Sequence, residues 1–235
     1  MEKLAVVMPV YNEEGAIGAV INKWMEKLDK LQIDYNIIAY NDGSKDNAAE
    51  ILEEIAKTQP QLIVVNKANS GHGPTILKAY RDNATQYSWI FQIDSDDEMS
   101  PEGFASLWGK RNDYDFLLGI RDGRLQQLPR KIISFVSRAC IKIFYGWVGV
   151  WDVNSPYRLM RSEKFADLFN KIPEDTFAPN VIVSGFVARK KLRFYETPVP
   201  CKPRETGEVS IKKWKLFKAA IKSFVQTIKF SFKVM

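Results

Sequence analysis

Residues 4–14 have the sequence LAVVMPVYNEE, in which seven apolar residues are followed by a tyrosine, an amide and two acids. A short, uninterrupted apolar run is typical of a strand whose two faces are both buried, as in a parallel sheet. The further apolar runs are residues 33–40, 62–65 and 89–93, and the helical patterns between the runs begin near Glu14, Lys45 and Pro74. Strand and helix alternating at this spacing predict an α/β fold with a mainly parallel central sheet.

The later half of the chain has a less regular pattern. We expect further strands and helices at Phe116–Ile120, Leu192–Pro198, Arg130–Tyr145 and Ser162–Lys171. With 235 residues, 46% of them hydrophobic, the chain can bury one substantial core. We therefore expect one domain over residues 1–208 and a basic amphipathic helix over residues 209–235.

The positive charge of the chain lies in its last segment. The net charge is +6, and residues 209–235 hold seven lysines and none of the 28 acids, so the preceding domain is close to neutral. This distribution argues against nucleic acid as a partner. In the same segment, apolar residues recur every three or four positions between the lysines. The pattern predicts a helix that lies on an anionic membrane surface, and packing on the domain or on a second subunit of a homo-oligomer is the alternative.

The sequence also predicts the cellular location of the protein. The N-terminus lacks the basic start and the cleavage site of a signal peptide. No apolar run reaches the roughly 18 residues that are needed to cross a bilayer. We expect a cytoplasmic protein that is peripheral at the inner face of the membrane, with 130–145 as a second interfacial helix or, alternatively, a core helix.

Polar residues follow four of the expected strands. They are residues 11–14, 41–46, 69–73 and 94–98, which are rich in carboxylates, amides and glycines. Because ligands of parallel α/β sheets bind beyond the carboxyl ends of the strands, these segments are expected to line one crevice.

The segment 94–98 has the sequence DSDDE and follows a buried run directly. Asp94 and Asp96 are two apart at the end of an extended strand, so both side chains point the same way and can share a cation. Carboxylates suit Mg²⁺ or Mn²⁺, and four acids would repel one another without a cation or a basic partner. A solvated surface turn is the alternative for this acidic segment.

Two further residues have both a functional and a structural interpretation. Asp42, in the sequence NDGS, could accept hydrogen bonds from a base or ribose, or could belong to an ordinary helix-capping turn. His72 is the only histidine, and it either contacts a phosphate or is a loop residue. A single histidine excludes mechanisms that need one histidine as base and another as metal ligand.

The segments VVMPVYNEE, NDGSKD and DSDD resemble, in order and spacing, the family-two inverting glycosyltransferases, which have the GT-A fold. The branch of dolichyl- and polyprenyl-phosphate sugar synthases is the most similar. The resemblance covers almost the whole chain and implies a UDP- or GDP-sugar donor. It implies nucleotide-binding residues at Pro9, Tyr11, Glu13, Asp42 and Asp94, and a catalytic metal site at Asp94, Asp96 and Glu98.

Three later segments also resemble that branch: GIR at 119–121, LPR at 128–130 and RETGEVS at 204–210. By this resemblance, the residues that would bind the acceptor or its phosphate are Arg121, Arg130, Ser134, Arg204 and Ser210. A surface salt bridge is the alternative for each arginine. The segment after Asp96 differs from the Asp-Leu-Gln of many lipid-phosphate synthases, and their paired transmembrane helices are absent.

The expected acceptor is a lipid phosphate such as polyprenyl phosphate. Its second pKa is near ~6, so it is mostly dianionic at neutral pH and can attack without a base. A saccharide acceptor would instead need a carboxylate base, for which Glu174 and Asp175 are the candidates. A catalytically inactive binding module is a further alternative. A Rossmann dehydrogenase is disfavoured because Ile76 stands where the motif beginning at Gly71 needs its third glycine.

Overall fold

The computed structural model describes residues 2–122, 128–146, 149–202 and 213–233. Its sheet has the strand order β3-β2-β1-β4-β6-β5-β7, with β6 antiparallel to both neighbours and the other pairs parallel. The strands are β1 (Leu4–Val10), β2 (Tyr35–Asn41), β3 (Leu62–Asn66), β4 (Trp89–Gln92), β5 (Phe116–Asp122), β6 (Arg158–Arg161) and β7 (Phe194–Pro200).

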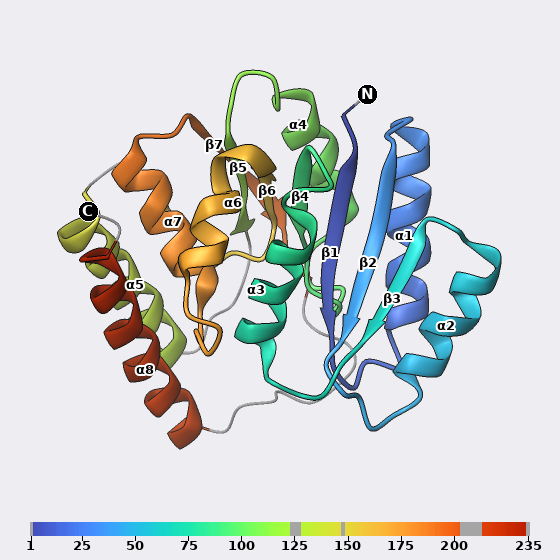
Figure 1. Cartoon of the computed structure of the whole chain (residues 1–235), viewed down its shortest axis with the longest axis horizontal. Helices are drawn as coiled ribbons and strands as arrows, with labels where there is room; N and C mark the ends of the chain where they lie inside the picture. The colour runs from blue at the N-terminus through green and yellow to red at the C-terminus, as the bar shows by residue number, and fades with distance from the viewer. Residues whose placement is uncertain (1, 123–127, 147–148, 203–212, 234–235) are drawn as a thin grey trace.

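Helices cover both faces of this sheet (Figure 1). The core on one face includes residues of the first two helices and α4, and the core on the other face includes residues of α3 and of α5 to α8. The helices are α1 (Ile17–Lys30), α2 (Ala48–Thr58), α3 (His72–Asn83), α4 (Phe104–Gly109), α5 (Leu128–Phe144), α6 (Ser162–Lys171), α7 (Pro179–Lys190) and α8 (Lys213–Ser231), and a short 3₁₀ helix, η1, spans Pro101–Gly103.

Helix α1 illustrates how the sequence builds these layers. Its apolar residues recur at three- and four-residue spacing, so one stripe of the helix faces the sheet. Trp24 in that stripe is 2% exposed, and its ring centroid lies 5.2 Å from that of Phe91 on β4. This burial fixes the middle of α1 against β4.

The predicted α/β fold and mainly parallel sheet are confirmed, and the predicted bounds of the recognised elements agree with the structure to within four residues. The expectation missed β6 and α4, and it gave no bounds for α7. Helix α7 is buried on almost every side, so its apolar residues show no amphipathic period. Strand β6 is only four residues long and has arginine at both ends, which hides it among loop residues.

The C-terminal helix α8 packs beside α5 and α7 (Figure 1). Phe230 is 2% exposed within the core, and the Thr227 carbonyl accepts a hydrogen bond from Tyr145 Oη at 2.7 Å. The opposite side of α8 exposes large apolar side chains, so the helix both completes the core and presents an apolar surface. Within the described ranges, no helix is long and apolar enough to cross a membrane.

Candidate active site

The loops that follow β1 and β2 are joined by reciprocal hydrogen bonds. The backbone N–H of Asn12 donates to Ser44 Oγ at 3.1 Å, and Asn12 Oδ1 accepts from the backbone N–H of Lys45 at 2.8 Å. One turn further on, Asp46 accepts from the backbone N–H of Glu14, whose own carboxylate accepts from Asn47. These hydrogen bonds hold the two segments together beyond the carboxyl ends of β1 and β2.

Three of the predicted nucleotide-binding residues belong to the first of these loops or the strand before it. Pro9 is buried in β1, Tyr11 is half-buried directly after it, and Glu13 is buried. The Glu13 carbonyl accepts hydrogen bonds from the backbone of Ala16 and Ile17, which starts α1. Their role toward a nucleotide stays a prediction.

Asp42 is 3% exposed and organises the loop that leads into α3. Its carboxylate pairs with the Lys67 ammonium, and it accepts hydrogen bonds from the backbone N–H groups of Ser70 and Gly71, each at 2.8 Å. Burial raises the pKa of Asp42, but Lys67 and the Ser70 N–H outweigh burial and hold the pKa below its ordinary value. A carboxylate oxygen can accept two hydrogen bonds, so Oδ2 retains capacity for a ligand. The capping interpretation fits Asp46 better, since that side chain accepts from Ala48 N–H.

Asp42→Asn is expected to lower the free energy of unfolding by about 2 kcal/mol at neutral pH, because it replaces a charge-assisted bond to Lys67 with a neutral one. The folded pKa of Asp42 lies below its ordinary 3.8, so its contribution is fully present above that pH and is lost as the pH falls through the folded pKa. Urea unfolding of both proteins at a series of pH values should therefore show their stabilities converging in acid. A difference that stays constant to pH 2 would contradict the assignment.

At the end of β4, Asp94 pairs with the single histidine. His72 Nε2, at the start of α3, lies 3.1 Å from Asp94 Oδ1, and the imidazole is 57% exposed. Loss of solvent around the ring lowers the pKa of His72, but Asp94 and then Asp96 outweigh this effect and raise it. The same loss of solvent raises the pKa of Asp94, and His72 and the more distant Arg121 outweigh it and lower the pKa. The site thus favours an ionised Asp94 beside an imidazolium.

A buried polar network contacts Asp94 through Gln92. Gln92 Nε2 donates to Asp94 Oδ1 at 3.4 Å, and Gln92 Oε1 accepts from Tyr80 Oη and from Asn180 Nδ2. The guanidinium of Arg158, which is fully buried, donates to the Asn180 carbonyl at 3.0 Å. Burial lowers the pKa of Arg158 to about 10, so it remains a cation beneath the site at neutral pH.

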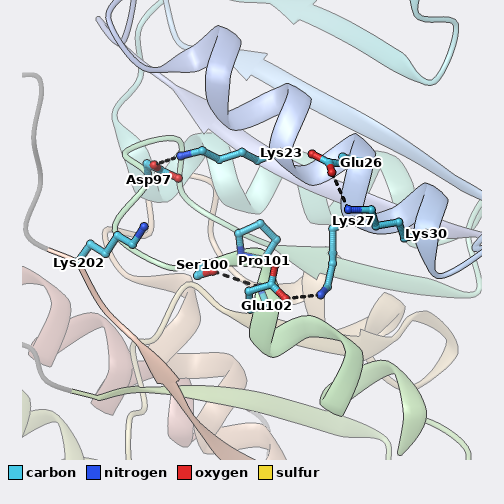
Figure 2. A pocket seen from close by; sticks show the side chains of 9 residues that line it. All are labelled: Lys23, Glu26, Lys27, Lys30, Asp97, Ser100, Pro101, Glu102 and Lys202. Carbon is cyan, nitrogen blue, oxygen red and sulfur yellow. Dashed lines mark hydrogen bonds and ion pairs between the residues drawn. The ribbon is translucent and has the colours of Figure 1, made fainter.

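The acids after Asp94 have separate partners. Asp96 Oδ1 accepts from the Glu98 backbone N–H at 3.2 Å, and Asp97 pairs with Lys23 on α1. This pair lines a cavity of about 390 Å³. Figure 2 shows the Lys202 ammonium directed toward the same carboxylate. None of the predicted nucleotide-binding residues lines this cavity. Lys23 and His72 are basic partners of two of the four acids, Asp97 and Asp94. Repulsion among the acids is therefore weaker than the sequence indicated, and it is weaker evidence for a bound metal.

The donor set around Asp94 and Asp96 nevertheless fits a hard divalent ion. In the described segments, no group of three acidic, histidine or cysteine side chains is placed to hold a metal. Two carboxylates are enough for Mg²⁺ when substrate phosphates and water complete the shell. The three-residue site with Glu98 stays a prediction, and the geometry favours a site completed by substrate.

The residues predicted to bind the acceptor are only partly brought together. The guanidinium of Arg121 forms a bidentate pair with Asp152 at 2.7 and 2.8 Å, with both side chains largely buried. Arg121 therefore forms a salt bridge, which was the alternative interpretation. Its charge still lowers the pKa of Asp94. Arg130 and Ser134 belong to α5. Arg204 and Ser210 lie outside the described residues.

The candidate base Asp175 lies in the loop between α6 and α7. Its carboxylate is well exposed and lies 3.2 Å from Lys222 Nζ of α8. The neighbouring Glu174 pairs with Arg81 of α3 at 3.3 Å. These contacts place the loop between α3 and α8, and the role of Asp175 as a base stays a prediction.

Sequence reasoning missed several residues that shape the site. Lys67 directly follows β3, so its position at a strand end was a usable signal. Asp152, Arg158 and Asn180 gave no such signal, because β6 was not recognised, the bounds of α7 were not predicted and the roles of these residues depend on tertiary contacts.

Comparisons with known proteins agree with this architecture. The chain matches Glycosyl transferase family 2 over residues 5–173. It is 27% identical over 226 residues to an uncharacterized glycosyltransferase of Synechocystis sp., covering 93% of this chain and 67% of that protein.

Two crystal structures of glucosyl-3-phosphoglycerate synthase from Mycobacterium tuberculosis, both in complex with Mn²⁺, UDP-glucose and phosphoglyceric acid, have TM-scores of 0.68 and 0.69 against this fold. Their sequences are 15% and 16% identical, and the matches cover 98% of this chain and 80% of theirs. At this identity the likeness concerns the fold, which is of the GT-A type. The family match spans well over half of the chain, and the chain belongs to glycosyl transferase family 2.

Proposed function

We propose that this protein transfers a sugar, with inversion, from a UDP- or GDP-sugar to the phosphate of a membrane lipid such as polyprenyl phosphate. The observation that carries the lipid acceptor is the surface of α5 and α8. These neighbouring helices, together with the residue that directly follows α8, expose seven large apolar side chains, which are Phe135, Val136, Ile143, Ile221, Phe224, Val225 and Phe232. We call these residues the apolar surface.

The charge around the apolar surface supports a membrane as its occupant. Ile221, Phe224, Val225 and Phe232 are spaced so that they share one side of α8. Lys218 and Lys222 on the same helix, and Lys233 shortly after its end, are exposed. Each lysine near an anionic surface contributes about 1 kcal/mol, and buried apolar area adds to this attraction. The protein would therefore be peripheral at a membrane, on the cytoplasmic side.

In the proposed reaction, an acceptor oxygen attacks the anomeric carbon as the bond from that carbon to the nucleotide diphosphate breaks. Asp94 and Asp96 would hold Mg²⁺ or Mn²⁺ together with the diphosphate, and the bound ion would supply positive charge to the leaving group. His72, held beside Asp94, is more than half exposed and can donate a hydrogen bond to a diphosphate oxygen. Arg158 adds a buried positive charge beneath the same carboxylate.

A different acceptor has its own supporting observation. The Mycobacterium enzyme with a similar fold was crystallised with phosphoglyceric acid and with glycerol 3-phosphate, which carry a phosphate without a lipid. A saccharide acceptor is the other alternative, and it would require Asp175 as a base. Exposure of that carboxylate leaves it accessible to a sugar hydroxyl.

An acceptor panel tests the proposal. Purified protein with Mn²⁺ and UDP- or GDP-sugars is expected to glycosylate a long-chain prenyl phosphate in anionic vesicles at least about tenfold faster than phosphoglyceric acid or a disaccharide, because surface attachment concentrates enzyme and lipid in one plane. Product formation is measured by mass spectrometry with each acceptor alone. A preference for phosphoglyceric acid or for the disaccharide would replace the lipid acceptor with that class.

A further inference from the structure

The loop of residues 173–178, between α6 and α7, contacts the start of α3 through its backbone. A Cβ atom added at Gly73 would lie 2.1 Å from the Phe177 carbonyl oxygen and 2.5 Å from that of Thr176. Those distances are far below van der Waals contact, so glycine at position 73 lets the loop approach this closely. Gly73 directly follows His72, the partner of Asp94. The position of the loop and the position of the imidazole are therefore linked.

The two ends of this loop have anchors of their own. At its beginning, Arg81 Nε donates to the Phe169 carbonyl at 2.9 Å and Arg81 also binds the Ile172 carbonyl. At its end, Asn180 belongs to the buried network beneath Asp94. Arg81 also pairs with Glu174 of the loop at 3.3 Å, so this anchor ends one residue before Asp175.

Two side chains of α8, Lys222 and Gln226, hold the middle of the loop, and Lys222 Nζ lies 3.2 Å from the Asp175 carboxylate. Gln226 Oε1 accepts from the Phe177 backbone N–H at 2.9 Å. Gln226 Nε2 donates to both the carbonyl and the carboxylate of Asp175, each at 3.2 Å. A single amide thus binds residues on both sides of Thr176, whose side chain is 1% exposed. The carbonyl of the adjacent α8 residue, Thr227, accepts a hydrogen bond from Tyr145, which directly follows α5, and this bond helps to fix the helix from which Gln226 extends.

We propose that Gln226 is a positioning residue for sugar transfer: it holds Asp175–Phe177 against the start of α3 and thereby sets the positions of Asp175 and His72 relative to Asp94. The inference rests on the proposed function, because the loop affects turnover only if transfer takes place beside Asp94. A misplacement of about 1 Å in such a site can lower the rate by up to about 100-fold.

The test compares Gln226→Leu with Gln86→Leu. Gln86 also donates one side-chain hydrogen bond to a backbone carbonyl, that of Asp82, but lies beyond the far end of α3. With a soluble short-chain prenyl phosphate, Gln226→Leu is expected to lower kcat about tenfold with the donor KM within twofold of the original, while Gln86→Leu leaves both unchanged. Equal kcat values in the two variants would overturn the proposal.

A second readout does not depend on turnover. His72 is the only histidine, so its imidazole gives one assignable NMR signal. At a fixed pH, Gln226→Leu is expected to shift that signal and to speed exchange of the Phe177 amide hydrogen, while Gln86→Leu changes neither. If the original protein transfers no sugar, the proposed function fails, and these two measurements still decide whether Gln226 positions the loop. An unmoved imidazole signal with normal protection of Phe177 would overturn the inference.

Discussion

Asp96→Asn is expected to lower kcat/KM for sugar transfer about 1000-fold. The substitution removes one of the two carboxylates proposed to hold the metal, and a loss of about 4 kcal/mol of transition-state stabilisation corresponds to this factor. The folded structure should survive, because the asparagine oxygen can still accept the hydrogen bond from the Glu98 N–H. Steady-state kinetics with added Mn²⁺ and a nucleotide sugar give the result directly.

The neighbouring acid provides the matched control. Asp97→Asn removes the same charge from the same loop, but Asp97 pairs with Lys23. Its φ of 55° lies in the left-handed region, which asparagine tolerates well. We expect kcat/KM within about threefold of the original and donor binding that still requires Mn²⁺ in calorimetry. Near-normal activity of Asp96→Asn, or equal losses in the two variants, would remove Asp96 from the metal site.

Replacing the α8 part of the apolar surface should release the protein from membranes. The triple variant Ile221→Ser, Phe224→Ser, Val225→Ser is expected to bind anionic vesicles at least about 100-fold more weakly, since burying each large apolar side chain contributes about 1.5–3 kcal/mol when it is complete and these side chains are buried only in part. Transfer to a long-chain prenyl phosphate should fall with binding, while transfer to a short-chain analogue persists. Vesicle sedimentation and parallel assays measure the two effects.

Substitution tests the surface better than deletion of the helix, because α8 also contributes Phe230 to the core and Gln226 to the loop before α7. Ile63→Ser is a suitable control, since Ile63 is 40% exposed on β3 and lies on neither helix. It should leave sedimentation unchanged. If the triple variant still sediments with vesicles, the apolar surface has another occupant, such as a second copy of the chain.

The first half of the fold was predictable because its pattern is local. Four apolar strands and the helices between them follow one another along the chain, and each carries the period of its own element. The second half depends on contacts that no short window contains. Helix α7 lacks a polar side because it is enclosed, and β6 is a strand because β4 and β5 leave a gap that it fills.

In the candidate site, too, local patterns were predictable and long-range contacts were not. The acids at strand ends were identified because the carboxyl edge of a parallel sheet is a known location for ligands. Their partners were not identifiable in the same way: Lys23 reaches Asp97 from the middle of α1, and Asp152 reaches Arg121 across 31 residues. Charge balance in a folded site is set by such distant pairs, so the sequence indicated an excess of acid that the fold largely neutralises.

The antiparallel strand β6 has a consequence for biosynthesis. During translation, β1 to β4 and their helices can assemble as soon as they leave the ribosome, since β2, β3 and β4 each pair with a strand made earlier. One edge of β4 then stays unpaired until Arg158–Arg161 has been synthesised. An open strand edge is a template for pairing with other chains. Nascent chains that stop before β6 are therefore the form of this protein most exposed to aggregation and most in need of a chaperone.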